Sequence, residues 1–494
     1  MYHGDSFQAG QTDSTARLTA TDLSNLRLET PAAPTHIGAL LIIDAAPLVD
    51  STGQLGLDEI RRRLELRLQR VPALRRRLFQ PGPFLGRPAW VDDKAFDIRN
   101  HILGLPLPPG AGDAELLEAA EQLMGSLLHR SRPLWELWLI TGLSRDRLGA
   151  LLKLHHAIAD GLAAVTILSS LLDFDARVPD PRPVRWSPAP EPRPWPLFVD
   201  NVSRRLTGVK RAKRVLMHPL RASATARATG GDLLRGLRGP AAPPSSINRR
   251  VAAGRLVRFA RFDLTAVSTR AHAAGGKVND VVLDLVAGGL RELLIGRGEP
   301  VAGLELIASV PVSLRAATDA GRLGNAVGVM TVPLDVGQAD AQRRLESIVA
   351  ATRRAKREQH PAHVQAFMAW LAAMPIAQAF IARQRLVNLF VTNIAGPPVP
   401  AYLLGARIVD VMPIVSPSGN VAIAFCAFSY AGCLYLVATV DAAACPDVDR
   451  LIAGAEDAWH NLCDATALVD GYELQDGTAN RLTHAASSEQ HPSQ

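Results

Sequence analysis

Apolar runs and amphipathic stretches alternate along the whole chain. The apolar runs are HIGALLIID (36–44), LGALLKLHH (148–156), RLVRFARFDL (255–264), LELIASVPVSLR (304–315) and VGVMTVPLD (327–335). Their length and β-branched content predict strands. The segments DGLAAVTILSSLLDF (160–174) and DVVLDLVAGGLRELL (280–294) instead repeat apolar residues at helical spacing. This alternation predicts an α/β fold with helices layered on sheets.

Two uncharged segments are nearly long enough to span a membrane. In the first, residues 421–440, Ser429 to Gly432 supply turn residues between β-branched and aromatic runs, so we predict a buried β-hairpin. In the second, residues 364–382, Pro375 interrupts a helical composition, so we predict a kinked core helix. The alternative for residues 364–382 is a helix lying in a membrane interface between flanking basic clusters.

Proline marks a division of the chain. Residues 179–196, PDPRPVRWSPAPEPRPWP, can sustain neither a helix nor a central strand, so we expect an extended linker there. We therefore divide the chain into five parts. These are a disordered N-terminus (1–16), an N-terminal half (17–178), a proline-rich and basic crossover (179–250), a C-terminal half (251–470) and a disordered tail (471–494).

The basic residues are concentrated in two places. The net charge is +7, and the excess lies in residues 61–77, which read as a basic amphipathic helix with Leu64, Leu68 and Val71 on one face, and in residues 204–239. Only 5% of residues are aromatic, so the basic stretches lack the stacking platforms of single-strand nucleic-acid binders. We expect no nucleic-acid partner; an anionic membrane surface or a CoA phosphate fits better.

Other features narrow the setting. The first residues, MYHGDSFQAGQTDSTARL, lack a basic start followed by an apolar run, so we expect no secretory signal and a cytoplasmic protein. The four cysteines show neither metal-ligand spacing nor a disulfide pattern, which favours reduced thiols.

The sequence KLHHAIADGLAAV (153–165) carries the candidate chemistry. It predicts a strand ending at His155 and a helix with Asp160 at its N-terminus, where a carboxylate satisfies unpaired amides. Because successive strand residues face opposite sides, one histidine can point into a cleft while the other packs. A neutral imidazole there can act as a general base on a hydroxyl. The chain has no Gly-x-Ser-x-Gly elbow, P-loop or dinucleotide fingerprint.

Two other interpretations of this pattern stay open from the residues alone. His156 and Asp160 are four residues apart and could ligate one metal ion if both were helical, although no third ligand cluster is evident. The pair could also be two core histidines beside a capping aspartate.

The motif and its flanks resemble a known family. His155-His156-x-x-x-Asp160-Gly161 resembles the active-site motif of CoA-dependent acyltransferases with a chloramphenicol-acetyltransferase-like fold. The flanking signatures are LTATDLSNLRLETPAAPTHIGALLIID near the start, RPLWELWLI (132–140), VNDVVLDLVAGGLREL (278–293), VPVSLR (310–315) and VTNIAGPPVPAYLLGARI (391–408). In this order they resemble the bacterial wax ester synthase/diacylglycerol acyltransferase (WS/DGAT) family.

This resemblance implies two chloramphenicol-acetyltransferase-like halves with an active-site tunnel between them. It implies a long-chain acyl-CoA co-substrate, a diacylglycerol or long-chain alcohol acceptor, and no metal or redox cofactor. Together with the basic stretches and the apolar segment 364–382, it leads us to expect a cytoplasmic protein that is peripheral at the inner membrane or at lipid droplets. Carried over to this sequence, His156 is the general base, His155 and Asp160 position it, and Gly161 leaves room for substrate.

Further matching positions are assigned supporting roles by the same resemblance. Asn279 and Asp280 open a predicted helix, where capping explains them as well as catalysis does. Thr392, Asn393 and Gly396 lie in a turn segment expected near the CoA or acyl entrance. The chain departs from the family pattern at Asn25, where an aromatic residue is usual.

Two other functions remain open alongside this assignment. One is a condensation-type acyltransferase that takes its acyl group from a carrier protein docked on the basic residues 204–239. The other is a non-catalytic lipid-binding relative that keeps the tunnel without turnover.

Overall fold

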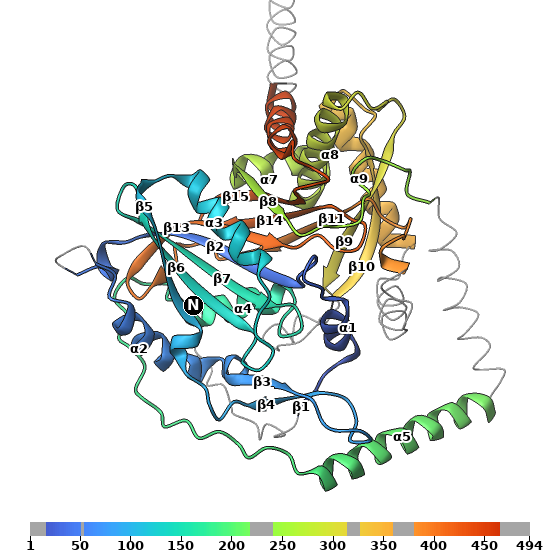
Figure 1. Ribbon diagram of the computed structural model, residues 1–494. Coiled ribbons are helices and arrows are strands. Elements are labelled where there is room, and N and C mark those ends of the chain that lie inside the picture. The colour runs from blue at the N-terminus through green and yellow to red at the C-terminus, as the bar shows by residue number, and fades with distance from the viewer. Residues whose placement is uncertain (1–15, 51–53, 218–240, 314–326, 359–379, 465–494) are drawn as a thin grey trace, which may run out of the picture.

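The computed structural model describes residues 16–50, 54–217, 241–313, 327–358 and 380–464. Within them, two six-stranded sheets form the body (Figure 1). The strands of the first sheet are, in order across it, β12 (Tyr402–Leu403), β13 (Ala406–Val415), β2 (His36–Asp44), β7 (Arg147–His155), β6 (Trp135–Leu143) and β5 (Ile102–Ala111). Neighbours pair antiparallel except β5 and β6, which are parallel.

The second sheet is built from the later part of the chain. Its strands are, in order, β10 (Val327–Asp335), β9 (Glu305–Ser313), β11 (Leu389–Ala395), β14 (Ile423–Tyr430), β15 (Cys433–Asp441) and β8 (Arg255–Asp263). The predicted hairpin at 421–440 is confirmed as β14 and β15. Its turn residues Ala431 and Gly432 both have positive φ (46° and 87°), as a two-residue turn matched to strand twist requires.

A small sheet and several helices complete the described fold. The small sheet has the order β1 (Ala16–Arg17), β4 (Ala89–Asp92), β3 (Arg76–Phe79). The α-helices are α1 (Ala20–Leu28), α2 (Leu57–Arg67), α3 (Asp113–Gly125), α4 (Gly161–Leu171), α5 (Pro194–Met217), α7 (Leu264–Ala273), α8 (Val278–Gly296) and α9 (Ala341–Glu358). Short 3-10 turns lie at Ala46–Leu48, Leu68–Arg70, Pro72–Arg75 and Ile98–Asn100. Helices α7, α8 and α9 cover one face of the second sheet and share its hydrophobic core (Figure 1).

One strand crosses between the halves proposed from the sequence. Strand β13 belongs to the segment after the proline-rich linker, yet it pairs with β2 in the first sheet from Val415–Ile37 to Ile408–Ile43. The core of the first sheet accordingly includes Ile408, Val411 and Met412. The linker in the chain and the boundary between the sheets therefore do not coincide.

The predicted helix at 61–77 is wrong in its extent. Helix α2 ends at Arg67, and two 3-10 turns and strand β3 occupy the remainder. Pro72 explains this, because a proline disfavours helical geometry at the residue before it. The apolar face is confirmed, since Leu64, Leu68 and Val71 are buried. Arg67 is buried as well, with Nη1 2.6 Å from Oδ2 of Asp173.

The proline-rich segment leads into helix α5. Residues 179–193 have no regular structure, and α5 begins at Pro194, so the prediction of an extended segment holds except for its last residues. Proline is tolerated in a first helical turn because the amides there need no helical partner. The described part of the basic stretch 204–239 is the C-terminal portion of α5, and the rest lies outside the described residues, as do most of 364–382, residues 1–15 and residues 471–494. Ala16, the last residue of the predicted disordered N-terminus, instead starts strand β1.

Side chains from both parts of the chain meet between the two large sheets. Oε1 of Glu121 in α3 accepts hydrogen bonds from the Val257 amide (2.7 Å) and from Arg258 (3.2 Å) at β8. Arg255 at the start of β8 donates to the carbonyl of Ala32 at 3.0 Å. Nowhere in the described ranges is a helix both long and apolar enough to cross a membrane.

Candidate active site

Four hydrogen bonds donated by backbone amides hold the two histidines and the turn after them in place. Strand β7 ends at His155, whose amide donates to the carbonyl of Leu134 at 3.0 Å. The amide of His156 donates to the carbonyl of Thr35 at 2.9 Å. The chain then turns, with the Ile158 amide on the His155 carbonyl at 2.9 Å and the Ala157 amide on Nδ1 of His155 at 3.0 Å. The position of the His156 side chain is thereby set by the ends of neighbouring strands.

Asp160 and Gly161 start helix α4 as the sequence predicts. Asp160 is the N-cap, and its Oδ1 accepts the Ala163 amide at 2.8 Å. A Cβ at Gly161 would lie 2.8 Å from Cδ1 of Ile394 in β11, so this glycine lets α4 approach the second sheet closely. The motif therefore lies where the two large sheets meet.

His155 is buried, and both of its ring nitrogens face protein groups. Because Nδ1 accepts an amide hydrogen, the ring proton of a neutral His155 lies on Nε2, which is 3.2 Å from Oε1 of Glu29. The same carboxylate oxygen lies 3.3 Å from Nε2 of His36, the cross-strand partner of His155 in β2. One glutamate thus bridges the two histidines.

The Glu29 carboxylate is held as an anion in the interior. Burial by itself raises the pKa of Glu29, but His155, His36 and Arg130 outweigh it and hold the pKa well below its usual range. Nη2 of Arg130 lies 2.9 Å from Oε2. A charged carboxylate beside two imidazoles fixes their orientation, as partners of this kind do for histidines at metal and catalytic sites.

His156 differs from its neighbour in exposure and in its contacts. It is half-buried, and burial lowers the pKa of its ring below the usual value, although a hydrogen bond to its own backbone and the carboxylates of Asp160 and Asp22 raise it. Nδ2 of Asn25 in α1 donates to the His156 carbonyl at 3.1 Å and lies 3.4 Å from Nδ1. A lowered pKa keeps the imidazole neutral at pH 7, which is the form that can accept a proton.

Asn279 and Asp280 lie at the start of α8. Lys277 is the N-cap, and Oδ2 of Asp280 accepts its amide at 2.8 Å, so both predicted residues fall in the first helical turn. The contacts described for Asp280 lie within the α7–α8 turn. The structure gives Asp280 a capping contact, and the supporting catalytic role stays a prediction.

The segment with Thr392, Asn393 and Gly396 lies beside the histidine loop. Thr392 and Asn393 pair with β14 within β11, next to Ile394, the residue that Gly161 faces. The Gly396 amide donates to the carbonyl of Ser429 at 3.0 Å, and a Cβ there would lie 2.3 Å from the Phe428 ring. Gly396 thus permits close packing, and a role of this segment in binding substrate stays a prediction.

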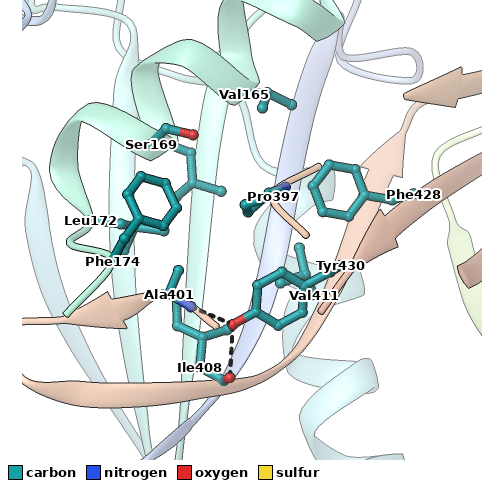
Figure 2. Close-up of a pocket in the computed structure, with 11 residues that line it drawn as sticks. Val165, Ser169, Leu172, Phe174, Pro397, Ala401, Ile408, Val411, Phe428 and Tyr430 are labelled. Carbon is teal, nitrogen blue, oxygen red and sulfur yellow. Dashed lines mark hydrogen bonds between the residues drawn. The ribbon is translucent and has the colours of Figure 1, made fainter. Parts of the chain in front are cut away.

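A shallow apolar pocket, partly open to solvent, lies between α4 and strands β13 and β14 (Figure 2). Its lining residues are Val165, Leu168, Ser169, Leu172, Phe174, Pro397, Ala401, Ile408, Val411, Phe428 and Tyr430. The hydroxyl of Tyr430 accepts the Ala401 amide at 2.8 Å and donates to the Ile408 carbonyl at 3.0 Å, so its polarity is satisfied. The pocket therefore offers hydrocarbon contacts, one helical turn beyond Gly161.

The metal interpretation requires a helical His156, and the structure does not provide one. Helix α4 begins at Gly161, and His156 lies in the preceding turn. In the part of the chain that the structure describes, no group of three His, Cys, Asp or Glu side chains is arranged to hold a metal ion.

Sequence reasoning assigned no role to Glu29, His36 and Asn25. All three stand in the LTATDLSNLRLETPAAPTHIGALLIID signature, which indicated the family without indicating their contacts. The available signal was a polar residue, His36, at the start of a strand whose next seven residues are apolar.

Comparisons with known proteins agree on one family. The wax ester synthase/diacylglycerol acyltransferase catalytic domain matches residues 18–282, and the WS/DGAT C-terminal domain matches residues 323–462. The chain is 31% identical over 432 residues to the probable diacylglycerol O-acyltransferase tgs1 of Mycobacterium tuberculosis, covering 85% of this chain and 90% of that protein.

Solved structures confirm the predicted fold class. A wax ester synthase/diacylglycerol acyltransferase from Marinobacter aquaeolei VT8 superposes with a TM-score of 0.65 at 23% identity, over 90% of this chain and 98% of that one. The first condensation domain of the calcium-dependent antibiotic synthetase superposes with a TM-score of 0.56 at 16% identity, over 91% and 96%.

Proposed function

The chain belongs to the wax ester synthase/diacylglycerol acyltransferase family and is an acyltransferase of that type, and on this premise we propose its substrates and its base. The donor is a long-chain acyl-CoA, the preferred acceptor is the free hydroxyl of diacylglycerol, and long-chain alcohols are also accepted. The general base is His156. The product is triacylglycerol or a wax ester, and the enzyme works at the cytoplasmic face of a membrane or at lipid droplets.

The observation that carries this proposal is the unequal engagement of the two histidines. His155 accepts an amide at Nδ1 and faces Glu29 through Nε2, so neither nitrogen is available to a substrate. His156 is half-buried, and its lowered pKa favours the neutral form. Of the two, only His156 combines access with the protonation state that a base needs.

The proposed reaction balances with this one residue. The imidazole of His156 takes the proton of the acceptor hydroxyl as the oxygen attacks the thioester carbonyl carbon. The resulting tetrahedral intermediate collapses, the carbon–sulfur bond breaks, and the imidazolium returns the proton to the CoA sulfur. No oxidation state changes and no covalent enzyme intermediate forms, so we propose that the reaction requires neither a metal nor a redox cofactor.

The apolar pocket gives the long chain a place to bind. Val165 and Ser169 line it from α4, the helix that Gly161 begins, and Pro397 and Ala401 line it from the β11–β12 loop (Figure 2). Apolar side chains with satisfied backbone groups favour a hydrocarbon over a polar ligand. We propose that this pocket holds part of an acyl or alkyl chain of the donor or the acceptor.

The test is CoA thiol release from palmitoyl-CoA with dioleoylglycerol and, separately, with hexadecanol, with the lipid products identified. Acceptor-dependent release that disappears in His156→Ala supports the proposal. Turnover only with an acyl group on a carrier protein would favour the condensation-type alternative. Lipid binding without release, unchanged in His156→Ala, would favour a non-catalytic lipid-binding protein.

A further inference from the structure

Helix α5 presents an unusual surface for a part of a folded enzyme. It runs beside the small β1–β4–β3 sheet and extends beyond the body (Figure 1). The large apolar side chains on it that are exposed against the described part of the chain are Trp195, Phe198, Val199, Val202 and Leu206. Trp195 is 71% exposed, and its ring stacks on Phe198 at a centroid distance of 5.8 Å. Scattered exposed apolar residues are ordinary, but five on one helix are not.

The spacing of these residues places them on one side of the helix. Trp195, Val199, Val202 and Leu206 follow the spacing i, i+4, i+7, i+11, which gives a single stripe on a helix. We call Trp195, Phe198, Val199, Val202 and Leu206 the α5 stripe. An amphipathic helix of a globular protein normally turns such a stripe to the core, and here the stripe faces outward.

The opposite side of α5 makes the contacts with the body. Leu197 is buried, and its carbonyl accepts a hydrogen bond from Arg17 at 3.3 Å. Arg17 also pairs with Asp200 at 3.1 Å. Nδ2 of Asn201 donates to the carbonyl of Phe84 at 2.7 Å. The orientation of the helix is therefore fixed by its polar side, which leaves the α5 stripe turned away.

Phe84 adds a second exposed aromatic next to the helix. It lies in the β3–β4 loop with φ of +67° and is 77% exposed. A positive φ at a phenylalanine is an unfavourable backbone conformation, and here the hydrogen bond from Asn201 joins it to α5. An exposed aromatic ring held beside an exposed apolar stripe extends the apolar surface of the helix.

The charge on α5 identifies what this surface contacts. From residue 204 to residue 214, RRLTGVKRAKR, the helix contains six basic residues and no acidic one. An apolar helix face with tryptophan and phenylalanine, combined with arginines and lysines, has the composition of helices that lie in the interface of a bilayer. Anionic phospholipid headgroups complement the basic residues, and each basic residue near such a surface adds to the attraction.

We propose that the α5 stripe and Phe84 form the surface by which this enzyme docks on an anionic phospholipid membrane. The apolar side chains enter the boundary between headgroups and acyl chains, and the positive charge of residues 204–214 attracts the anionic headgroups. The proposal deepens the proposed function, because a diacylglycerol acceptor resides in such a membrane. Its own readout is binding, which does not depend on turnover.

The experiment is flotation of the full chain with vesicles of phosphatidylcholine containing phosphatidylglycerol. The test variant is Trp195→Ser/Phe198→Ser/Leu206→Ser, and the matched control is Ile295→Ser, an exposed apolar residue at the end of α8. We expect the triple variant to bind at least about tenfold more weakly, because three buried apolar side chains are lost from the bilayer contact. The control should bind as the wild type does.

A charge-reversal variant tests the headgroup contact. Arg205→Glu/Lys210→Glu should lose binding to vesicles with phosphatidylglycerol and change little on pure phosphatidylcholine. Turnover of a short-chain, water-soluble acceptor should be the same in all variants, whereas turnover of diacylglycerol in vesicles should fall with binding. If neither the wild type nor any variant turns over an acceptor, the proposed function is wrong. The flotation experiment still shows whether the α5 stripe binds the membrane.

Three results would overturn the proposal. One is triple-variant binding equal to the wild type. Another is a wild-type protein that does not float with the phosphatidylglycerol vesicles even at low salt. The last is a triple variant that has a smaller oligomeric state than the wild type or unfolds at a lower temperature, since the α5 stripe would then be covered by a second copy or by another part of this chain.

Discussion

Nε2 of His155 lies 3.2 Å from Oε1 of Glu29, and that oxygen also lies 3.3 Å from Nε2 of His36. The contact joins the end of helix α1 to the ends of strands β2 and β7. It explains why the first histidine of the motif is buried, because its ring completes a polar cluster below the loop. His156 follows His155 directly in the chain, so the loop that carries it cannot move without breaking this cluster.

Glu29→Gln should reduce catalysis without weakening substrate binding. Replacement of the carboxylate by an amide removes the charge that orients His155, and the loop carrying His156 loses its fixed position. We expect kcat to fall roughly 10²-fold, the cost of a small misplacement of a reacting group, while KM for acyl-CoA changes little. Steady-state kinetics measure both. Glu59→Gln, at an exposed ion pair with Arg62, is the matched control.

The same variant should change the response of stability to acid. The pKa of Glu29 is lowered in the folded state, so its contribution to stability is present above the unfolded pKa, near 4.5, and is lost as the pH falls below it. Denaturant unfolding should show wild type more stable than Glu29→Gln at pH 7, with a smaller difference at pH 4. A difference that grows on acidification would contradict the ionised state assigned to Glu29.

His156→Ala should remove acyl transfer and leave the fold intact. The loss of a general base costs about 10²- to 10⁴-fold in rate. CoA release with diacylglycerol measures the effect, and thermal unfolding checks that the fold is kept. His272→Ala, at an exposed histidine of α7, should retain full activity. Residual activity in His156→Ala above a tenth of wild type would assign the base elsewhere.

The pH profile should report the lowered pKa of His156. Because the neutral ring is the active form, kcat/KM should be constant at neutral pH and fall in acid as the ring is protonated. Burial lowers the pKa of His156, so the acidic inflection should lie below the ordinary histidine value of 6.5. The measurement is kcat/KM from pH 5 to 8 with a soluble acceptor. An inflection above 6.5 would mean that a charged partner, and not burial, governs this ring.

A larger side chain in the apolar pocket should shorten the preferred chain. Val165→Phe places additional volume between α4 and Phe428 (Figure 2). We expect kcat/KM for a sixteen-carbon substrate to fall about tenfold or more while an eight-carbon substrate is less affected, since a few excluded methylenes account for such a factor. Ile295→Phe, far from the pocket in the sequence and exposed, should leave the profile unchanged. An equal loss for both lengths would exclude this pocket as the chain site.

The buried pair of Arg344 and Asp284 should be a sensitive point for stability. Nε of Arg344 lies 2.8 Å from Oδ1 of Asp284, and both side chains are buried. Arg344→Met should cost about 3–5 kcal/mol, because it leaves a buried carboxyl without its partner. Arg344→Met/Asp284→Leu should recover most of this loss, and Arg343→Met, at an exposed neighbour, should cost little. Denaturant unfolding measures all three.

The sign of the pH effect provides a check on that pair. Burial raises the pKa of Asp284 to about 6, against the opposing effect of Arg344. The folded state then binds more protons than the unfolded state, so this group favours folding at low pH, and its contribution is lost as the pH rises through 6. Without Arg344 this trend should be stronger, so Arg344→Met should be more destabilising at pH 8 than at pH 5.

Local pattern alone predicted many of the elements. Strands β2 and β10 run from the first to the last residue of their apolar runs, and α4 begins one residue after Asp160. These predictions of element bounds are correct because hydrophobic periodicity and helix capping depend only on residues close together in the chain. The prediction failed at 61–77, where an arginine-rich helical pattern ends at Arg67 ahead of Pro72.

What the sequence by itself determined is a part of the strands and helices, the order of the motifs and the family to which they point. Only the tertiary structure decided that Glu29 joins His36 to His155, that β13 enters the first sheet, and that Gly161 meets Ile394. Apart from the contact of Glu29 with His36, these contacts join residues far apart in the chain. Periodicity reports which face of an element is apolar, but the partner of that face is set by the packing of the whole molecule.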